Sequence, residues 1–239
     1  MKLDICFSPD LLSLYDLRGK VAVIVDVLRA TSTIVTALAQ GVPAVFPVAT
    51  LEECAELGRA HGYLTAAERD GVAAEGFDLG NSPFGFLDGK LAVRGRDLAI
   101  STTNGTKALR LSLAADAVVC GAFLNLQAIV KFAAAQQRDV LVVCAGWKGQ
   151  FCLEDSLFGG ALAEQLAPLG FDITSSDSAL AALHLWQHAK PDWPHYLLQS
   201  AAVRRLNALE AHDDFIFCMQ VDTHPEILPL WQGDRLIMG

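Results

Sequence analysis

The stretch VAVIVDVLRATST, residues 21–33, joins an uninterrupted apolar run to a polar loop that leads into a helix. Val21–Val25 contains no polar side chain, which is typical of a parallel strand covered on both faces. Residues 26–33 are rich in hydroxyl groups, and the spacing that follows predicts an amphipathic helix over 32–40, which Gly41 can close. This strand–loop–helix order is the unit from which parallel α/β sheets are built.

The same order recurs twice along the chain. LAI, from Leu98, leads into STTNGT at 101–106, and VLVVC, from Val140, leads into AGWKGQFCLED at 145–155. All three loops therefore follow the carboxyl ends of strands, and in open α/β sheets that edge is where ligands bind. The loops predict a shared anion and metal site.

The remaining pattern predicts an α/β fold, with a predominantly parallel sheet or sheets flanked by helices and built from repeated βαβ units. Further strands are expected at 3–7, 44–48, 98–101, 117–120 and 140–144, and further helices at 51–60, 105–113, 126–136 and 155–167. Residues 64–81 are expected to form a loop, and the chain beyond Pro168 to be helical before a strand, DFIFCMQ, from Asp214. One compact domain over 1–239 is preferred, and a division into two lobes would fall near 71–95.

Composition excludes several classes of protein. The 239 residues are 52% hydrophobic, enough to fill a core. The 18 basic and 27 acidic residues give a net charge of −9 without a basic cluster, which argues against nucleic-acid binding. No uncharged run is long enough to span a bilayer, and the N-terminus does not resemble a signal peptide. We expect a soluble cytoplasmic protein with no membrane partner, and a homodimer is compatible with the sequence.

Asp26 is the first candidate for metal binding. It ends a strand that is otherwise apolar, where a buried carboxylate is costly unless it is paired or bound to a metal. The alternative is an N-cap role for the following helix, although the hydroxyls of Thr31 and Ser32 are better placed for it.

Three further acids lie in other expected loops: Glu68, in AAERDG, and the pair Glu154 and Asp155. Carboxylates from several loops would repel one another unless a cation neutralised them, and oxygen ligands with few histidines favour Mg²⁺ over zinc. The structural alternatives are a solvated pair of Glu68 with Arg69, and an acidic first helix turn at 154–155 stabilised by the helix dipole.

Anion-binding candidates lie in the same loops. Arg29 can present a guanidinium fork to a phosphate or carboxylate, and an ion pair with Asp26 is its structural alternative. Lys148, between two glycines, is a mobile cation or simply an exposed lysine. The STTNGT loop can cradle an oxyanion with its backbone N–H groups, or it can cap the following helix; its residues are Ser101, Thr102, Thr103, Asn104, Gly105 and Thr106.

Common signatures of other enzymes are missing. The patterns GxGxxG, GxxxxGK[ST] and GxSxG do not occur, which argues against standard dinucleotide, P-loop and α/β-hydrolase sites. His184 and His188 have helical spacing, but Leu185 stands where a zinc protease has glutamate.

Taken together, the motifs resemble the 2-phosphosulfolactate phosphatase family. The matching stretches, in family order, are VIVDVLRATSTIVTAL from Val23, ERDGVAAEGFDLGNSP from Glu68, STTNGTKAL from Ser101, CAGWKGQFCLEDSLFGGAL from Cys144 and DFIFCMQVD from Asp214. The resemblance implies an α/β fold peculiar to that family. It also implies a magnesium-dependent phosphomonoesterase that converts 2-phospho-3-sulfolactate to 3-sulfolactate, a step toward coenzyme M.

On this resemblance the candidate site residues take roles in phosphate release. The catalytic candidates are Asp26, Arg29, Glu68 and Asp155, and the candidate ligands of Mg²⁺ are Asp26, Glu68, Glu154 and Asp155. The candidates for binding the small anionic phosphorylated substrate are Thr31, Ser32, Asn81, Ser82, Ser101, Thr102, Thr103, Asn104, Gly105, Thr106 and Lys148. Of these, Asn81 and Ser82 are expected to orient a carboxylate or sulfonate.

Two features of the reaction stay open at this point. Leu28 stands where haloacid-dehalogenase-type phosphatases have their second aspartate, which favours direct attack by water over an aspartyl-phosphate. The alternative functions are a magnesium-dependent phosphatase of another small phosphorylated hydroxyacid and a non-catalytic anion-binding protein.

Overall fold

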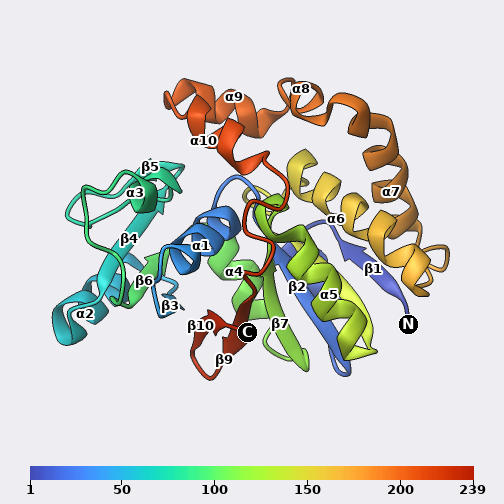
Figure 1. The fold of residues 1–239 in the computed structure, drawn as a ribbon, viewed down its shortest axis with the longest axis horizontal. Helices are drawn as coiled ribbons and strands as arrows, with labels where there is room; N and C mark the ends of the chain where they lie inside the picture. Colours follow the sequence, from blue (N-terminus) through green and yellow to red (C-terminus); the bar gives the residue numbers. More distant parts are fainter.

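The computed structural model describes residues 1–239 as a ten-stranded sheet with helices packed against it (Figure 1). The strands are β1 Leu3–Cys6, β2 Lys20–Val25, β3 Ala44–Pro47, β4 Leu64–Arg69, β5 Val72–Ala73, β6 Leu98–Ser101, β7 Ala117–Gly121, β8 Asp139–Cys144, β9 Pro229–Gln232 and β10 Arg235–Met238. The α-helices are α1 Ala30–Ala39, α2 Leu51–His61, α3 Phe84–Leu87, α4 Gly105–Leu111, α5 Leu126–Gln136, α6 Leu153–Leu166, α7 Asp177–Ala189, α8 Trp193–Leu197, α9 Ala201–Ala208 and α10 His212–Cys218. Short 3-10 helices are η1 Pro9–Leu14, η2 Phe123–Asn125, η3 Ala167–Leu169 and η4 Lys190–Asp192.

The sheet has two parallel parts that a C-terminal hairpin joins. Its strand order is β1-β8-β2-β7-β9-β10-β3-β6-β4-β5. Strands β1, β8, β2 and β7 are parallel, as are β3, β6 and β4. The hairpin β9–β10 is antiparallel to β7 on one side and to β3 on the other. The predicted α/β class with a mostly parallel sheet is confirmed. Residues 71–95 connect β4 to β6, which pair directly, so this segment lies within one parallel part.

Strand β2 shows why its sequence is apolar throughout. Val21, Val23 and Val25 face a core of 36 buried residues that includes the inner sides of α5, α6 and α7. Ala22 and Ile24 face a second core of 24 buried residues, which includes side chains of α1 and α4. Each fully buried aliphatic side chain contributes about 1.5–3 kcal/mol, so a polar residue on either face of this strand would be costly. The pairing of β2 with β7 and β8 ends at Val25, and the loop after the strand begins there.

Two predictions about secondary structure are wrong. The segment expected to be a loop over 64–81 contains β4 and β5, because the small side chains of 64–67 are buried beside β6 and act as core. The segment DFIFCMQ forms α10 instead of a strand. Its buried residues Phe215, Cys218 and Met219 are spaced by three and one, which is a helical pattern in a run too short for its period to be decisive.

None of the helices combines the length and the apolar character that crossing a bilayer requires.

Candidate active site

A pocket of about 440 Å³ lies where the predicted loops meet. Figure 1 shows α9 and α10 above the end of the sheet at which β2 leads into α1. The pocket is lined by the loops after β2, β6 and β8, by the end of β4 and its turn, and by α9: Asp26, Leu28, Arg29, Glu68, Asp70, Gly71, Asn81, Asn104, Trp147, Ala202, Arg205, Leu206 and Leu209. Segments far apart in the sequence thus form one cavity, as expected for the carboxyl edge of a parallel sheet.

Asp26 directly follows β2 and is 9% exposed. Its Oδ1 accepts the Ala30 N–H at 3.3 Å, so it supports the start of α1. Burial, together with the negative charges of Glu68 and Glu154, raises the pKa of Asp26 to about 7. A β-carbon on Gly105 would lie 2.9 Å from Asp26 Oδ2, so glycine at the start of α4 is what allows the close approach.

The capping role expected of the hydroxyls near Asp26 is wrong. Thr31 and Ser32 lie inside α1 and are buried. The Asp26 N–H donates to Thr31 Oγ1 at 3.1 Å, and Ser32 Oγ donates to the Val27 carbonyl at 2.8 Å. Both side chains therefore fix the loop after β2, and neither lines the pocket of about 440 Å³.

Asp155 ties two of the loops together from the first turn of α6. Its Oδ1 accepts the Val27 N–H at 2.9 Å, and its Oδ2 accepts the Gly146 N–H at 3.1 Å. Burial, with the charges of Glu154 and Asp26, raises its pKa well above the usual range. Because both oxygens are engaged by backbone donors, Asp155 acts in this geometry as a support for the loops after β2 and β8.

Glu154 differs from its neighbour in having an unused oxygen. Its side chain is buried, and its Oε2 has no hydrogen-bond partner. Burial raises its pKa. Glu154 is therefore not a solvent-exposed acid of a first helix turn. An exposed carboxylate is hydrated, whereas Glu154 is buried and one of its oxygens has no partner.

Glu68, at the end of β4, is also buried and lines the pocket. Its Oε1 accepts the Thr103 N–H and its Oε2 accepts the Gly71 N–H, both at 2.7 Å. The alternative of a solvated pair with Arg69 is wrong, because Arg69 donates instead to the Glu68 backbone carbonyl and to Ser101 Oγ. Glu68 thereby holds the STTNGT loop against the turn after β4.

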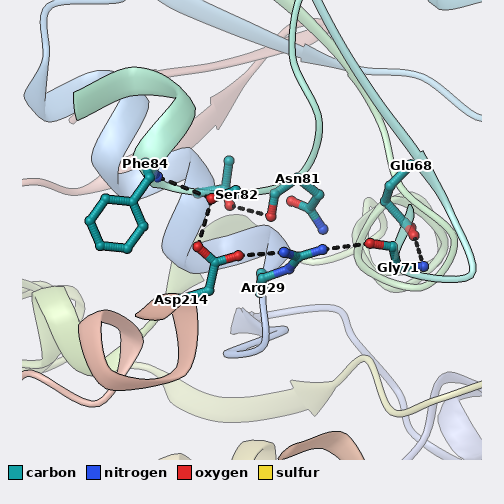
Figure 2. A network of polar contacts seen from close by, with 8 residues as sticks. Arg29, Glu68, Gly71, Asn81, Ser82, Phe84 and Asp214 are labelled. Carbon is teal, nitrogen blue, oxygen red and sulfur yellow. Dashed lines mark hydrogen bonds and ion pairs between the residues drawn. The ribbon is translucent and has the colours of Figure 1, made fainter. Parts of the chain in front are cut away.

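Arg29 forms the centre of a buried polar network (Figure 2). Its Nη1 pairs with the carboxylate of Asp214 on α10, and its Nη2 donates to the Gly71 carbonyl at 2.7 Å. Ser82 Oγ donates to the other oxygen of Asp214 at 2.6 Å. The expected ion pair of Arg29 with Asp26 is not formed. Arg29 pairs with Asp214 instead. The negative charge of Asp214 compensates the positive charge of Arg29. The role of Arg29 is therefore to hold the wall of the pocket in place.

The STTNGT loop is mainly a folded turn. Thr102 Oγ1 accepts the Thr106 N–H at 3.2 Å near the start of α4, whereas the N-cap residue itself, Asn104, makes no capping bond with its side chain. Asn104 Oδ1 accepts the Lys148 N–H at 3.0 Å and so links this loop to the one after β8. Of the six residues from 101 to 106, only Asn104 lines the pocket of about 440 Å³, while Thr103 Oγ1 is buried without a partner.

The other predicted substrate-binding residues divide between the pocket and its surroundings. Asn81 lines the pocket, is 7% exposed and has an Oδ1 without a partner. Ser82 instead belongs to the network of Arg29. Lys148 is exposed and forms an ion pair with Asp70 at 2.6 Å, so the alternative of an exposed lysine describes it better.

Sequence reasoning missed three contributors to the site. The sequence pattern places Asp214 in a strand. The helical spacing of the buried residues after Asp214 is the signal that indicates a helix. Trp147 and Arg205 are brought together from the loop after β8 and from α9, with the Arg205 guanidinium carbon 4.2 Å from the Trp147 ring centroid. No local pattern connects residues 58 positions apart in this way.

The acidic donors fit a magnesium ion held by few protein ligands. No three histidine, cysteine or acidic side chains are placed together as a set of metal ligands. Mg²⁺, however, usually keeps several waters and takes only one or two carboxylates in addition to substrate phosphate oxygens. Asp26, in the pocket, offers such oxygens, and the buried Oε2 of Glu154, which lines a neighbouring pocket, is a second oxygen without a partner.

The comparisons with known proteins agree over nearly the whole chain. Residues 6–233 match the family described as "2-phosphosulpholactate phosphatase". A protein of Caldanaerobacter subterraneus subsp. tengcongensis, named a probable 2-phosphosulfolactate phosphatase, is 37% identical over 221 residues, 91% of this chain and 90% of its own. Relatives with the same name are 35% identical in Symbiobacterium thermophilum, over 93% of this chain and 96% of theirs, and 36% identical in Pseudothermotoga lettingae, over 98% of both. The chain therefore belongs to the 2-phosphosulpholactate phosphatase family.

Proposed function

We propose that this protein is a magnesium-dependent phosphatase that hydrolyses 2-phospho-3-sulfolactate to 3-sulfolactate and phosphate, in the direction of coenzyme M. The names of its relatives support the reaction. The observation that carries the proposal is the single pocket in which Asp26, Glu68 and Arg205 meet from three distant segments. Such a pocket offers carboxylate oxygens for a cation and a guanidinium for an anion. The six cysteines are free and buried, which suits a reducing compartment such as the cytoplasm.

The metal would supply Lewis-acid polarisation of the phosphoryl oxygens. Asp26 would hold it, with Glu154 as the second carboxylate. Asp155 and Glu68 keep the loops around it in place through their bonds to backbone N–H groups. These fixed contacts reduce the reorganisation that the site would need as charge develops.

The protein groups around the phosphoryl position favour attack by water. Leu28 lines the pocket and carries no group that could protonate the leaving oxygen, unlike the second aspartate that haloacid-dehalogenase-type phosphatases have at this sequence position. Asn81 and Asn104 also line it and carry amide groups that can orient a phosphate oxygen or a water. Direct hydrolysis is therefore the mechanism that we propose.

A substrate panel with detection of released phosphate tests the proposal. 2-Phospho-3-sulfolactate and 2-phospholactate are each incubated with Mg²⁺ and with a chelator. We expect turnover of the sulfonated ester with Mg²⁺ and its loss in chelator. Preferred turnover of 2-phospholactate would identify the related hydroxyacid phosphatase. Tight binding without phosphate release from either ester would identify a non-catalytic anion-binding protein.

A homodimer remains a prediction from the sequence. Light scattering coupled to gel filtration measures the mass that tests it.

A further inference from the structure

Arg205 differs from the other arginine of the pocket in having no ion-pair partner. Arg29 and Arg205 both line the cavity of about 440 Å³. The charge of Arg29 is compensated by buried Asp214. Arg205 takes part in none of the ion pairs of the structure. Burial raises the pKa of Glu154 and the charge of Arg205 partly offsets this effect, but no carboxylate lies within ion-pair distance of Arg205, so its N–H groups remain available to an anionic ligand.

The face of Trp147 holds the Arg205 guanidinium. The guanidinium carbon lies 4.2 Å from the ring centroid, within the distance of a cation–π contact. Stacking of this kind occupies the flat face of the guanidinium and leaves the N–H groups at its edge free. Both side chains are half-buried, so the contact is partly desolvated and its electrostatic attraction for an anion is less screened than on the surface.

Arg205 also stands at the boundary between two cavities. Together with Trp147 and Ala202 it lines the candidate active site and a neighbouring pocket of about 630 Å³. Asp26 lines only the first of these pockets, whereas Glu154 lines only the second. A ligand group bound by Arg205 would therefore lie on the α9 side of the site, where space continues beyond it.

We propose that Arg205 binds the sulfonate of the substrate and so determines the preference for sulfonated phosphoesters, an inference that rests on the proposed function. The phosphoryl group belongs with Asp26, which lines only the first of the two pockets. The carboxylate of the substrate is attached to the same carbon as the ester oxygen, whereas the sulfonate is one carbon further away and is the group that can extend toward α9. A sulfonate is fully ionised at neutral pH and accepts the paired N–H groups that a guanidinium edge offers.

Replacement of Arg205 by methionine tests the proposal, with R204M as the matched control. Arg204 is the adjacent residue of α9 and is exposed. For R205M we expect kcat/KM for 2-phospho-3-sulfolactate to fall about 10- to 100-fold, the range of a lost hydrogen bond to a charged group, mainly through KM. For 2-phospholactate, which lacks the sulfonate, we expect less than about a threefold change. R204M should leave kcat/KM for both substrates unchanged.

A similar fall for both esters would overturn the proposal, because Arg205 would then act on the phosphate, the carboxylate or the fold. Unchanged kinetics for both esters would overturn it as well. A thermal melt of R205M checks that the variant is folded.

Calorimetric binding of 3-sulfolactate and of lactate separates this inference from the proposed function. If the unaltered protein hydrolyses neither ester, the proposed function fails while the binding measurement still decides the role of Arg205. Weaker binding of 3-sulfolactate by R205M, with lactate unaffected, supports the inference. Equal affinity of both proteins for 3-sulfolactate contradicts it.

Discussion

The carboxylates of this site have different roles, and the hydrogen bonds of each carboxylate indicate which role it has. Asp155 gives both oxygens to backbone N–H groups, whereas Glu154 keeps one buried oxygen without a partner. Asp26 lies in the pocket and makes one bond to the start of α1. Sequence reasoning identified all three residues because acids are rare after apolar strands. It could not divide the roles among them, because the roles depend on which backbone groups reach each oxygen.

Replacement of Asp26 by asparagine should separate activity from stability. We expect phosphate release with Mg²⁺ to fall at least about 100-fold, as for the loss of an electrostatic contact to the reacting group. Thermal stability at pH 8 should be maintained or raised, because the variant removes a buried negative charge. Asp16→Asn, at an exposed position, is the control and should retain full activity. Unchanged turnover in D26N would rule out Asp26 as a metal ligand.

The buried pair of Arg29 and Asp214 should behave as a unit in urea unfolding. We expect R29M and D214N each to lower the free energy of unfolding by about 3–5 kcal/mol, because each leaves an uncompensated buried charge. The double variant should lose clearly less than the sum of the two. Additive losses would show that the two side chains do not interact.

At the scale of elements, the sequence revealed the strands that are apolar throughout and missed those whose signal is weak. The sequence predicts β2, β6 and β8 to within about two residues of their observed ends, because continuous burial leaves a continuous apolar run. The sequence does not predict β4, because its segment LTAAER contains alanines, which are not strand formers. The strands β9 and β10 pair with each other, but the place of this hairpin in the sheet comes from pairing with β7 and β3, which lie far away in the sequence. No local pattern predicts such pairing.

The start of α4 makes a separate prediction about Gly105. A β-carbon there would lie 2.8 Å from Ala30 Cβ and 2.9 Å from Asp26 Oδ2. We expect G105A to lower the free energy of unfolding by about 1–3 kcal/mol, as overpacking does, and to reduce turnover by displacing Asp26. Lys107→Ala, on an exposed turn of the same helix, should keep kcat. A variant G105A with unaltered melting temperature and kcat would contradict the close packing of the two loops.

For the whole molecule, the clustered acids imply a link between pH, metal and stability. Burial raises the pKa of Asp26 from 3.8 to about 7, which corresponds to at most about 4 kcal/mol. The folded protein therefore holds a proton that the unfolded chain has released. The stabilising contribution is present below about pH 4 and is lost as the pH rises toward 7.

We accordingly expect Mg²⁺ to raise the melting temperature more at pH 8 than at pH 5. At pH 8 Asp26 is ionised and the cation offsets its buried charge, whereas at pH 5 a bound proton already does so. For a chain of this size, each kcal/mol of added free energy of unfolding raises the melting temperature by about 2–4 °C. D26N should show a smaller difference between the two pH values. An equal effect of Mg²⁺ at both would contradict the coupling.

The convergence of strand-end loops on one cation is most directly tested by titrating Mn²⁺, a spectroscopic substitute for Mg²⁺, into the metal-free protein and counting free ions by electron paramagnetic resonance. The geometry predicts one saturable site per chain, weakened at least about tenfold in D26N and unaffected in D16N. Absence of a saturable site, or equal affinity in all three proteins, would contradict it.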